Sequence, residues 1–124
     1  MAILGPFLEL RARPGVYLAG QMAGVEGYVE SAALGLLAGA FAAFAARGKT
    51  PPLPPETTAH GALLRHLREG SPQDFQPMNV NYGLFPELPG LPRRAPKREK
   101  NELLAARALS DLAPFAARLA LSPA

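Results

Sequence analysis

The chain has 124 residues, a formal net charge of +3 and a pI near 9.7, and it contains no cysteine. The length limits it to at most one domain, and the missing cysteine excludes disulfides, thiolate metal sites and a cysteine nucleophile within these residues. Fourteen prolines and twelve glycines indicate that much of the chain is not regular core, while the mild positive charge permits an RNA partner without requiring one.

The apolar stretches do not predict a membrane or secreted protein. Met1–Phe7 is apolar but lacks the basic segment that begins a secretory signal. The longest apolar run, Ala32–Ala46, has fifteen residues, which is short for a bilayer core of about 30 Å. We therefore expect a soluble, cytoplasmic protein.

The first predicted element is a β-hairpin. Phe7–Arg11 alternates apolar and polar residues, Ala12–Gly15 is typical of a turn, and Val16–Ala19 reads as a short buried strand. Two strands alone are marginally stable, so this hairpin needs a larger sheet to join.

A glycine-rich stretch follows and connects the expected strand to a helix. Gly20, Gly24 and Gly27 let the backbone bend sharply and let a ligand approach without a Cβ in the way. The N–H groups of the first helical turn favour an electron-rich partner, such as a phosphate or the pyrimidine edge of a flavin. The spacing is not Gly-x-Gly-x-x-Gly, so the residues alone leave the ligand open, and a turn that serves only packing is the alternative.

The alanine-rich segment from about Tyr28 to Arg47 predicts a helix with two ridges. The bulky ridge is formed by Leu34, Leu37, Phe41 and Phe44, and the small ridge by Ser31, Gly35, Gly39 and Ala43. The small ridge indicates close approach of a backbone, another helix or a cofactor. Tight packing against a sheet is the favoured interpretation, and only the first turn lies close enough to the glycine stretch to contact a ligand.

The middle of the chain predicts a spacer and a short helix. Gly48–Pro55 reads as a stiff linker, and Thr57 or Thr58 can cap a helix that runs to about Glu69. The two histidines of this helix, His60 and His66, fall on different faces, so we expect no metal site.

The last third combines a long loop, a basic run and a helix. Phe75–Phe85 mixes aromatic and amide side chains, which can wall a pocket or simply pin the loop over the core. The basic run Arg93–Lys100 can contact nucleic-acid phosphates or be a solvated surface. The final helix has an apolar stripe from Leu104 to Leu119, and Pro114 should kink or restart it.

Several of these blocks resemble one family in the same order along the chain. Ala19-Gly20-Gln21 followed by Gly24–Ala32 resembles the C-terminal flavin motif of the folate- and FAD-dependent tRNA (uracil-5-)-methyltransferases. Pro54–Ala59, Gly61–Leu64 and Phe75–Leu84 resemble further blocks, so the resemblance runs from about Leu8 to the end. Val25–Ser31 resembles the larger tRNA wobble-uridine-modifying flavoprotein of the same superfamily less closely.

The resemblance implies an α/β fold, as the C-terminal fragment of a two-dinucleotide-binding-domain flavoprotein with a β-hairpin, a long helix and a loop-rich helical extension. Residues 1–48 would complete an FAD-binding domain, and residues 49–124 would form the linker, short helix, pocket-lining loop and last helix. The implied cofactor-binding residues are Gly20, Gln21, Gly24, Val25, Glu26, Gly27, Tyr28 and Ser31. The implied substrate-binding residues are Tyr28, Asn79 and Asn81, and the candidate tRNA-binding residues are Arg93, Arg94, Lys97, Arg98 and Lys100.

The resemblance also implies a chemistry and a missing part. Methylenetetrahydrofolate would supply the one-carbon unit and reduced FAD the electrons, with NADPH also associated with the family, and uracil C5 of tRNA would be the acceptor. Gly20 and Gln21 would lie near the ribityl chain, with the start of the helix at the N1/O2 edge of the flavin. The chain has no Gly-x-Gly-x-x-Gly motif, so it would need an N-terminal FAD-binding portion or a partner chain and would be inactive alone. The alternative is a non-catalytic helical interaction or RNA-binding module derived from such an enzyme.

Overall fold

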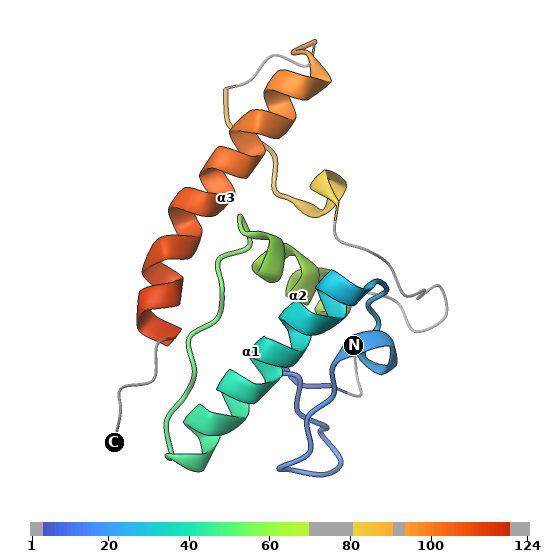
Figure 1. Ribbon diagram of the computed structural model, residues 1–124, viewed down its shortest axis with the longest axis vertical. Helices are drawn as coiled ribbons and strands as arrows, with labels where there is room; N and C mark the ends of the chain where they lie inside the picture. Colours follow the sequence, from blue (N-terminus) through green and yellow to red (C-terminus); the bar gives the residue numbers. More distant parts are fainter. Residues whose placement is uncertain (1–3, 70–80, 91–93, 120–124) are drawn as a thin grey trace.

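The structure, a computed structural model, describes residues 4–69, 81–90 and 94–119. Within these ranges it contains helices α1 (Tyr28–Ala46), α2 (Ala59–Glu69) and α3 (Lys97–Leu119), and the 3-10 turns η1 (Gly20–Ala23) and η2 (Tyr82–Leu84). Figure 1 shows α1 and α2 beside the N-terminal segment, with α3 along the other side of the molecule.

The N-terminal segment is folded back on itself but does not form regular strands. Single antiparallel bridges pair Leu4 with Leu10 and Glu9 with Tyr17, and the Leu18 N–H donates to the Leu8 carbonyl at 3.0 Å. Leu8 has a φ of 66°, a left-handed conformation that interrupts an extended strand. The expected β-hairpin is therefore not confirmed, and the part of the α/β fold that the structure describes is mainly helical.

Helix α1 forms where the sequence predicts it and buries its bulky ridge. Leu34, Leu37 and Phe41 are fully buried, and Phe44 is half-buried. The helix ends at Arg47, whose N–H donates to the Ala43 carbonyl at 3.3 Å.

The small ridge of α1 differs from the expectation. A Cβ added at Gly35 or at Gly39 would meet no other atom within 4 Å, and both residues are exposed. The described residues of this chain therefore do not supply the expected partner of this ridge, and packing against a portion outside the chain stays a prediction. By length and composition alone, the 19 residues of α1 are also sufficient to cross a membrane.

Helix α2 is confirmed and is built against the proline linker. The Thr58 hydroxyl accepts a hydrogen bond from the Gly61 N–H at 3.0 Å and donates one to the Pro55 carbonyl at 2.6 Å, so Thr58 caps the helix. A Cβ at Gly61 would lie 1.9 Å from the Pro55 oxygen. Only glycine fits there, because the helix approaches the linker backbone directly.

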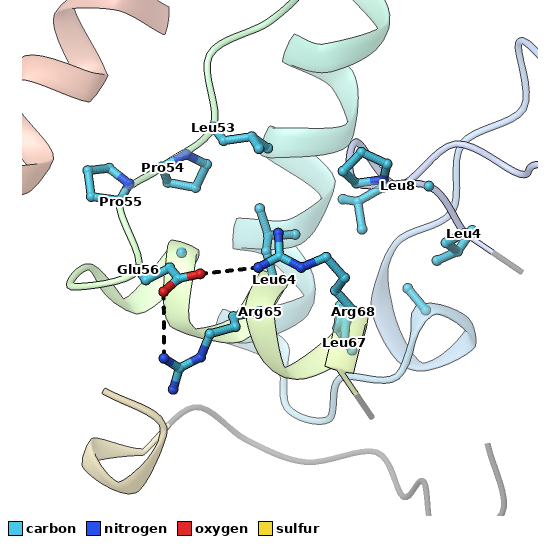
Figure 2. Close-up of a pocket in the computed structure, with 14 residues that line it drawn as sticks. Leu4, Leu8, Leu53, Pro54, Pro55, Glu56, Leu64, Arg65, Leu67 and Arg68 are labelled. Atoms are coloured by element: carbon cyan, nitrogen blue, oxygen red, sulfur yellow. Dashed lines mark hydrogen bonds and ion pairs between the residues drawn. The ribbon is translucent and has the colours of Figure 1, made fainter. Parts of the chain in front are cut away.

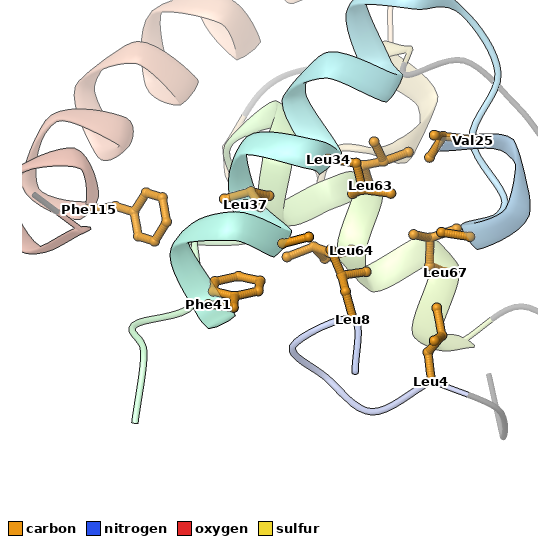
Figure 3. Close-up of a cluster of buried hydrophobic side chains, with 12 residues drawn as sticks. Leu4, Leu8, Val25, Leu34, Leu37, Phe41, Leu63, Leu64, Leu67 and Phe115 are labelled. Carbon is orange, nitrogen blue, oxygen red and sulfur yellow. The ribbon is translucent and has the colours of Figure 1, made fainter. Parts of the chain in front are cut away.

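One hydrophobic core joins these segments, and Figure 3 shows its largest side chains pointing toward one another. Each buried leucine or phenylalanine of this kind stabilises the fold by roughly 1.5–3 kcal/mol. The core takes residues from the N-terminal loop, the glycine turn and all three helices: Leu4, Leu8, Ala23, Val25, Leu34, Leu37, Ala38, Phe41, Leu63, Leu64, Leu67 and Phe115.

Helix α3 is attached by its apolar stripe and by two polar contacts. Leu104 and Phe115 are buried, and the helix runs unbroken through Pro114. The Thr57 hydroxyl donates to the Asp111 carboxylate, and the Arg107 guanidinium donates to the carbonyls of Pro86 and Glu87. The predicted stripe is confirmed, whereas the proline does not restart the helix.

Candidate functional site

The glycine stretch forms a compact turn that requires its glycines. Gly20, Gly24 and Gly27 have φ values of 74°, 110° and 96°, which residues with a side chain rarely adopt. The Gly24 N–H donates to the Gln21 carbonyl at 3.0 Å, and the Val25 N–H donates to the Gly20 carbonyl at 3.3 Å. These bonds close η1 and lead the chain directly into α1.

The turn is anchored on one side and open on the other. Ala23 and Val25 are fully buried in the core, so Val25 has only its backbone to offer a ligand. Gln21, Glu26 and Gly27 are exposed. Tyr28 is 97% exposed, so its ring is available to a ligand or another chain.

The start of α1 leaves backbone donors for a ligand. Gly27 is the N-cap residue, and no side chain caps this helix. The first intrahelical bond runs from the Ser31 N–H to the Gly27 carbonyl at 3.1 Å, so the N–H groups of the preceding three residues have no helical acceptor. Together with the helix dipole, these donors suit an anion or the electron-rich edge of a heterocycle.

The turn also brings Gly20 beside Ser31. A Cβ at Gly20 would lie 3.6 Å from the Ser31 hydroxyl oxygen, so the turn places the start of η1 next to the first turn of α1. Of the eight predicted cofactor-binding residues, Gln21, Glu26, Gly27 and Tyr28 are exposed, and Gly20 and Ser31 are half-buried beside each other. The other two, Gly24 and Val25, are buried.

Of the predicted substrate-binding amides, Asn81 is described and Asn79 lies outside the described residues, as does Phe75–Val80. The Asn81 Oδ1 accepts from the Gly83 N–H at 2.8 Å and caps η2. Asn81 lines a shallow hollow with Ala59, Tyr82 and Phe85. This amide oxygen is thus already used to shape the loop.

The start of α2 links this hollow to α1. Ala59 borders the Asn81 hollow and also a second apolar groove of about 120 Å³ that Val29, Glu30 and His60 line. Partial burial lowers the pKa of His60 below its ordinary value. The described residues bring no three His, Cys, Asp or Glu side chains together as metal ligands.

The predicted basic run lies apart from the glycine turn. Arg94, Lys97, Arg98 and Lys100 are exposed at the start of α3, which lies at the far end of the molecule from η1 (Figure 1). Arg98 pairs with Glu102 at 3.4 Å, and an exposed pair of this kind contributes little to stability. Arg93 falls outside the described residues.

Sequence reasoning missed a cavity of about 220 Å³ between the N-terminal loop, the proline linker and α2. Figure 2 shows Glu56 at its edge, paired with Arg65 at 3.6 Å and with Arg68 at 3.1 Å. The Arg65 guanidinium also donates to the Leu84 carbonyl at 2.9 Å. Arg65 and Arg68, three residues apart in α2, could have indicated a shared acidic partner such as Glu56. The linker sequence, however, is typical of a spacer and does not predict a pocket wall.

The chain is similar to known proteins over most of its length. A family model described as "Glucose inhibited division protein A" matches residues 2–50. Curated relatives named "Methylenetetrahydrofolate--tRNA-(uracil-5-)-methyltransferase TrmFO" are 54% identical over 94% of the chain in Syntrophotalea carbinolica and 54% identical over 91% in Desulforudis audaxviator. The matched part spans 25% and 26% of those relatives. The resemblance seen in the motif blocks is thereby confirmed, for a chain about a quarter as long as its relatives.

Proposed function

We propose that this chain is the C-terminal part of a folate- and FAD-dependent tRNA (uracil-5-)-methyltransferase. The observation that carries the proposal is the identity of 54% across nine-tenths of the chain to relatives named as methylenetetrahydrofolate–tRNA-(uracil-5-)-methyltransferases. The proposal includes a cytoplasmic location and the need for an N-terminal FAD-binding portion or partner chain.

The role of the glycine turn in this enzyme would be to hold the flavin. Its fit is supported by the positive φ values of its glycines, its uncapped helix start and its exposure. When bound, reduced FAD would supply electrons and methylenetetrahydrofolate the one-carbon unit. The backbone donors at the start of α1 would orient the flavin and favour negative charge on it.

The remaining candidate residues would contact the substrates. Tyr28, 97% exposed at the helix start, would contact the ring of the flavin or of the substrate. Asn79 and Asn81 would contribute to the pocket wall. Arg93, Arg94, Lys97, Arg98 and Lys100 would contact tRNA phosphates, which supplies affinity rather than sequence choice.

The cofactor role is tested by restoring the missing part. The chain is co-expressed with the other three quarters of the Syntrophotalea carbinolica relative, and the purified complex is examined for flavin absorbance and for methylation of uracil in tRNA. We expect a yellow, active complex, and loss of activity in Tyr28→Ala with the complex intact. Leu109→Ala, at an exposed position of α3, is the control. A colourless complex after addition of FAD would contradict the proposal.

The tRNA role is tested by the salt dependence of binding. Replacing Arg94, Lys97, Arg98 and Lys100 together with alanine should lower the slope of log K against log salt by roughly 0.7–0.9 for each phosphate that the chain no longer neutralises. Arg118→Ala, an exposed arginine at the opposite end of α3, should leave the slope unchanged. If the fourfold alanine variant also leaves it unchanged, the basic run does not bind tRNA.

A further inference from the structure

The side of α1 that faces away from the core is apolar and uncovered. Tyr28, Val29 and Leu36 are 97%, 78% and 67% exposed. At 100° per residue Tyr28 and Leu36 share one side of the helix with Ala32, Gly35 and Gly39, opposite the buried Leu34, Leu37 and Phe41, while Val29 lies at the edge of this side and also lines the groove with α2. We call the outer set, Tyr28, Ala32, Gly35, Leu36 and Gly39, the outer face of α1.

This face is unsuited to permanent contact with water. The sequence has no charged or polar residue from Ala32 to Ala46, so α1 is apolar around its circumference beyond its first turn. Surface helices normally carry charged and polar residues on the side opposite the core, and a helix that is apolar all round is covered on all sides by protein or by lipid.

The neighbourhood of α1 favours protein over lipid. The buried side of α1 forms one groove with α2, where Leu34 and Leu37 lie against Leu63 (Figure 3). Helix α2 carries Arg65, Arg68 and Glu69, and it would have to enter the bilayer with α1. Charged side chains at that depth are costly, so lipid does not suit this face although its length would allow a span.

The length of the relatives favours one occupant for this face. The matched part is 25% of the Syntrophotalea carbinolica relative, which leaves about three quarters of that protein outside this chain. The family model that matches residues 2–50 includes all of α1. The large missing portion must pack somewhere on this chain, and the outer face is the apolar surface that one continuous helix provides for it.

We propose that the outer face of α1 is the surface on which the remaining portion of the enzyme packs, with a helix of that portion crossing α1 at Gly35 and Gly39. The two glycines lie one turn apart and open into free space, so a crossing helix can place its apolar ridge against the backbone of α1. Leu36 lies beside that crossing and supplies apolar area. The proposal rests on the proposed function, because it takes the occupant from the relatives.

Substitutions at the two glycines test the crossing without harming the fold. The tagged chain is co-expressed with the other three quarters of the Syntrophotalea carbinolica relative, and the dissociation constant of the complex is measured. Gly35→Leu and Gly39→Leu should each weaken association by tenfold or more, because the new side chain occupies the space of the crossing helix. In the chain by itself, both variants should unfold at the same denaturant concentration as the original or at a higher one. Leu109→Glu on α3 is the matched control and should not change association.

The following results would overturn the proposal. Unchanged association in both leucine variants, or no association of the original chain, would show that the portion packs elsewhere or not at all. Dimerisation of the original chain alone that Gly39→Leu abolishes would assign the face to a second copy. Binding of the chain to phosphatidylcholine–phosphatidylglycerol vesicles, abolished in Leu36→Glu, would assign it to lipid. A tight but colourless complex would instead contradict the flavin role and leave the packing proposal standing.

Discussion

Helices α1 and α2 both contribute leucines to the same core. They differ in the surroundings of their glycines and in the charge on their outer sides. In α2, Gly61 lies against the Pro55 backbone, whereas Gly35 and Gly39 of α1 open into free space. The outer side of α2 carries Arg65 and Arg68, and the outer face of α1 carries no charge. The difference supports the proposal that a protein portion outside this chain covers the outer face of α1, whereas the glycine of α2 is covered within the chain.

The largest expected effect tests the closed glycine of α2. Gly61→Ala would place a Cβ 1.9 Å from the Pro55 oxygen, so the helix or the linker must move. Overpacking of this kind typically costs about 1–3 kcal/mol and occasionally more, and we expect about 3 kcal/mol less stability in urea unfolding. Gly35→Ala is the matched control. A loss below about 1 kcal/mol, within the error and spread of such measurements, would mean that α2 is not packed against the linker as described.

The next effect concerns how the two helices begin. Helix α2 is capped by the buried Thr58, whereas α1 begins at Gly27 without a side-chain cap. Thr58→Ala should reduce the free energy of unfolding by about 2 kcal/mol, since it removes the cap and the bond to the Pro55 carbonyl. Thr58→Ser should recover most of that stability. Equal stability of the alanine and serine variants would contradict the capping role.

A stabilising change is expected on the open side of α1. In the chain by itself, Gly39→Ala should raise the free energy of unfolding by about 1 kcal/mol, because alanine is the better helix former and nothing lies within reach of its Cβ. The midpoint of thermal unfolding should rise accordingly. A lower midpoint would show that this side is already packed, and the contrast between the helices would disappear.

The smallest effect is a pH dependence at the groove between α1 and α2. Burial lowers the pKa of His60 below its ordinary 6.5, so the unfolded chain binds a proton more readily than the folded one. Because the folded chain favours neutral His60, the contribution of His60 to the free energy of unfolding is present in full above pH 6.5. It falls as the pH decreases below that value, until His60 is protonated in the folded chain too. Glu30 also lines the groove. His60→Gln should flatten the pH profile of urea unfolding, and an unchanged profile would remove His60 as its cause.

Local patterns predicted the helices well. The bulky ridge of Leu34, Leu37 and Phe41 specified the buried side of α1, and Thr57 or Thr58 followed by apolar residues specified α2, of which Thr58 is the cap. The glycine turn was also predictable, since glycines at those spacings permit few other conformations. These features depend on residues close together in the sequence.

Features that depend on distant residues were not predictable. The pattern of Phe7–Ala19 indicated strands, but the conformation at Leu8 and the lack of further pairing in the described ranges leave only isolated bridges. No sequence pattern around Gly61 predicted its contact with Pro55. The small ridge of α1 indicated a packing partner, but the sequence did not show whether this chain provides that partner. The cavity beside Glu56 is formed by three separate segments, so no single stretch predicts it.

The attachment of α3 has a consequence for its basic start. Its first buried side chain is Leu104, seven residues after Lys97, so the first two turns extend roughly 10 Å beyond the anchored part of the helix. The positive charges on these turns are mechanically separate from the core. A polyanion could bind to these turns or dissociate from them without changing the free energy of folding. Substitutions that remove the charges would weaken this binding and leave the melting temperature unaltered.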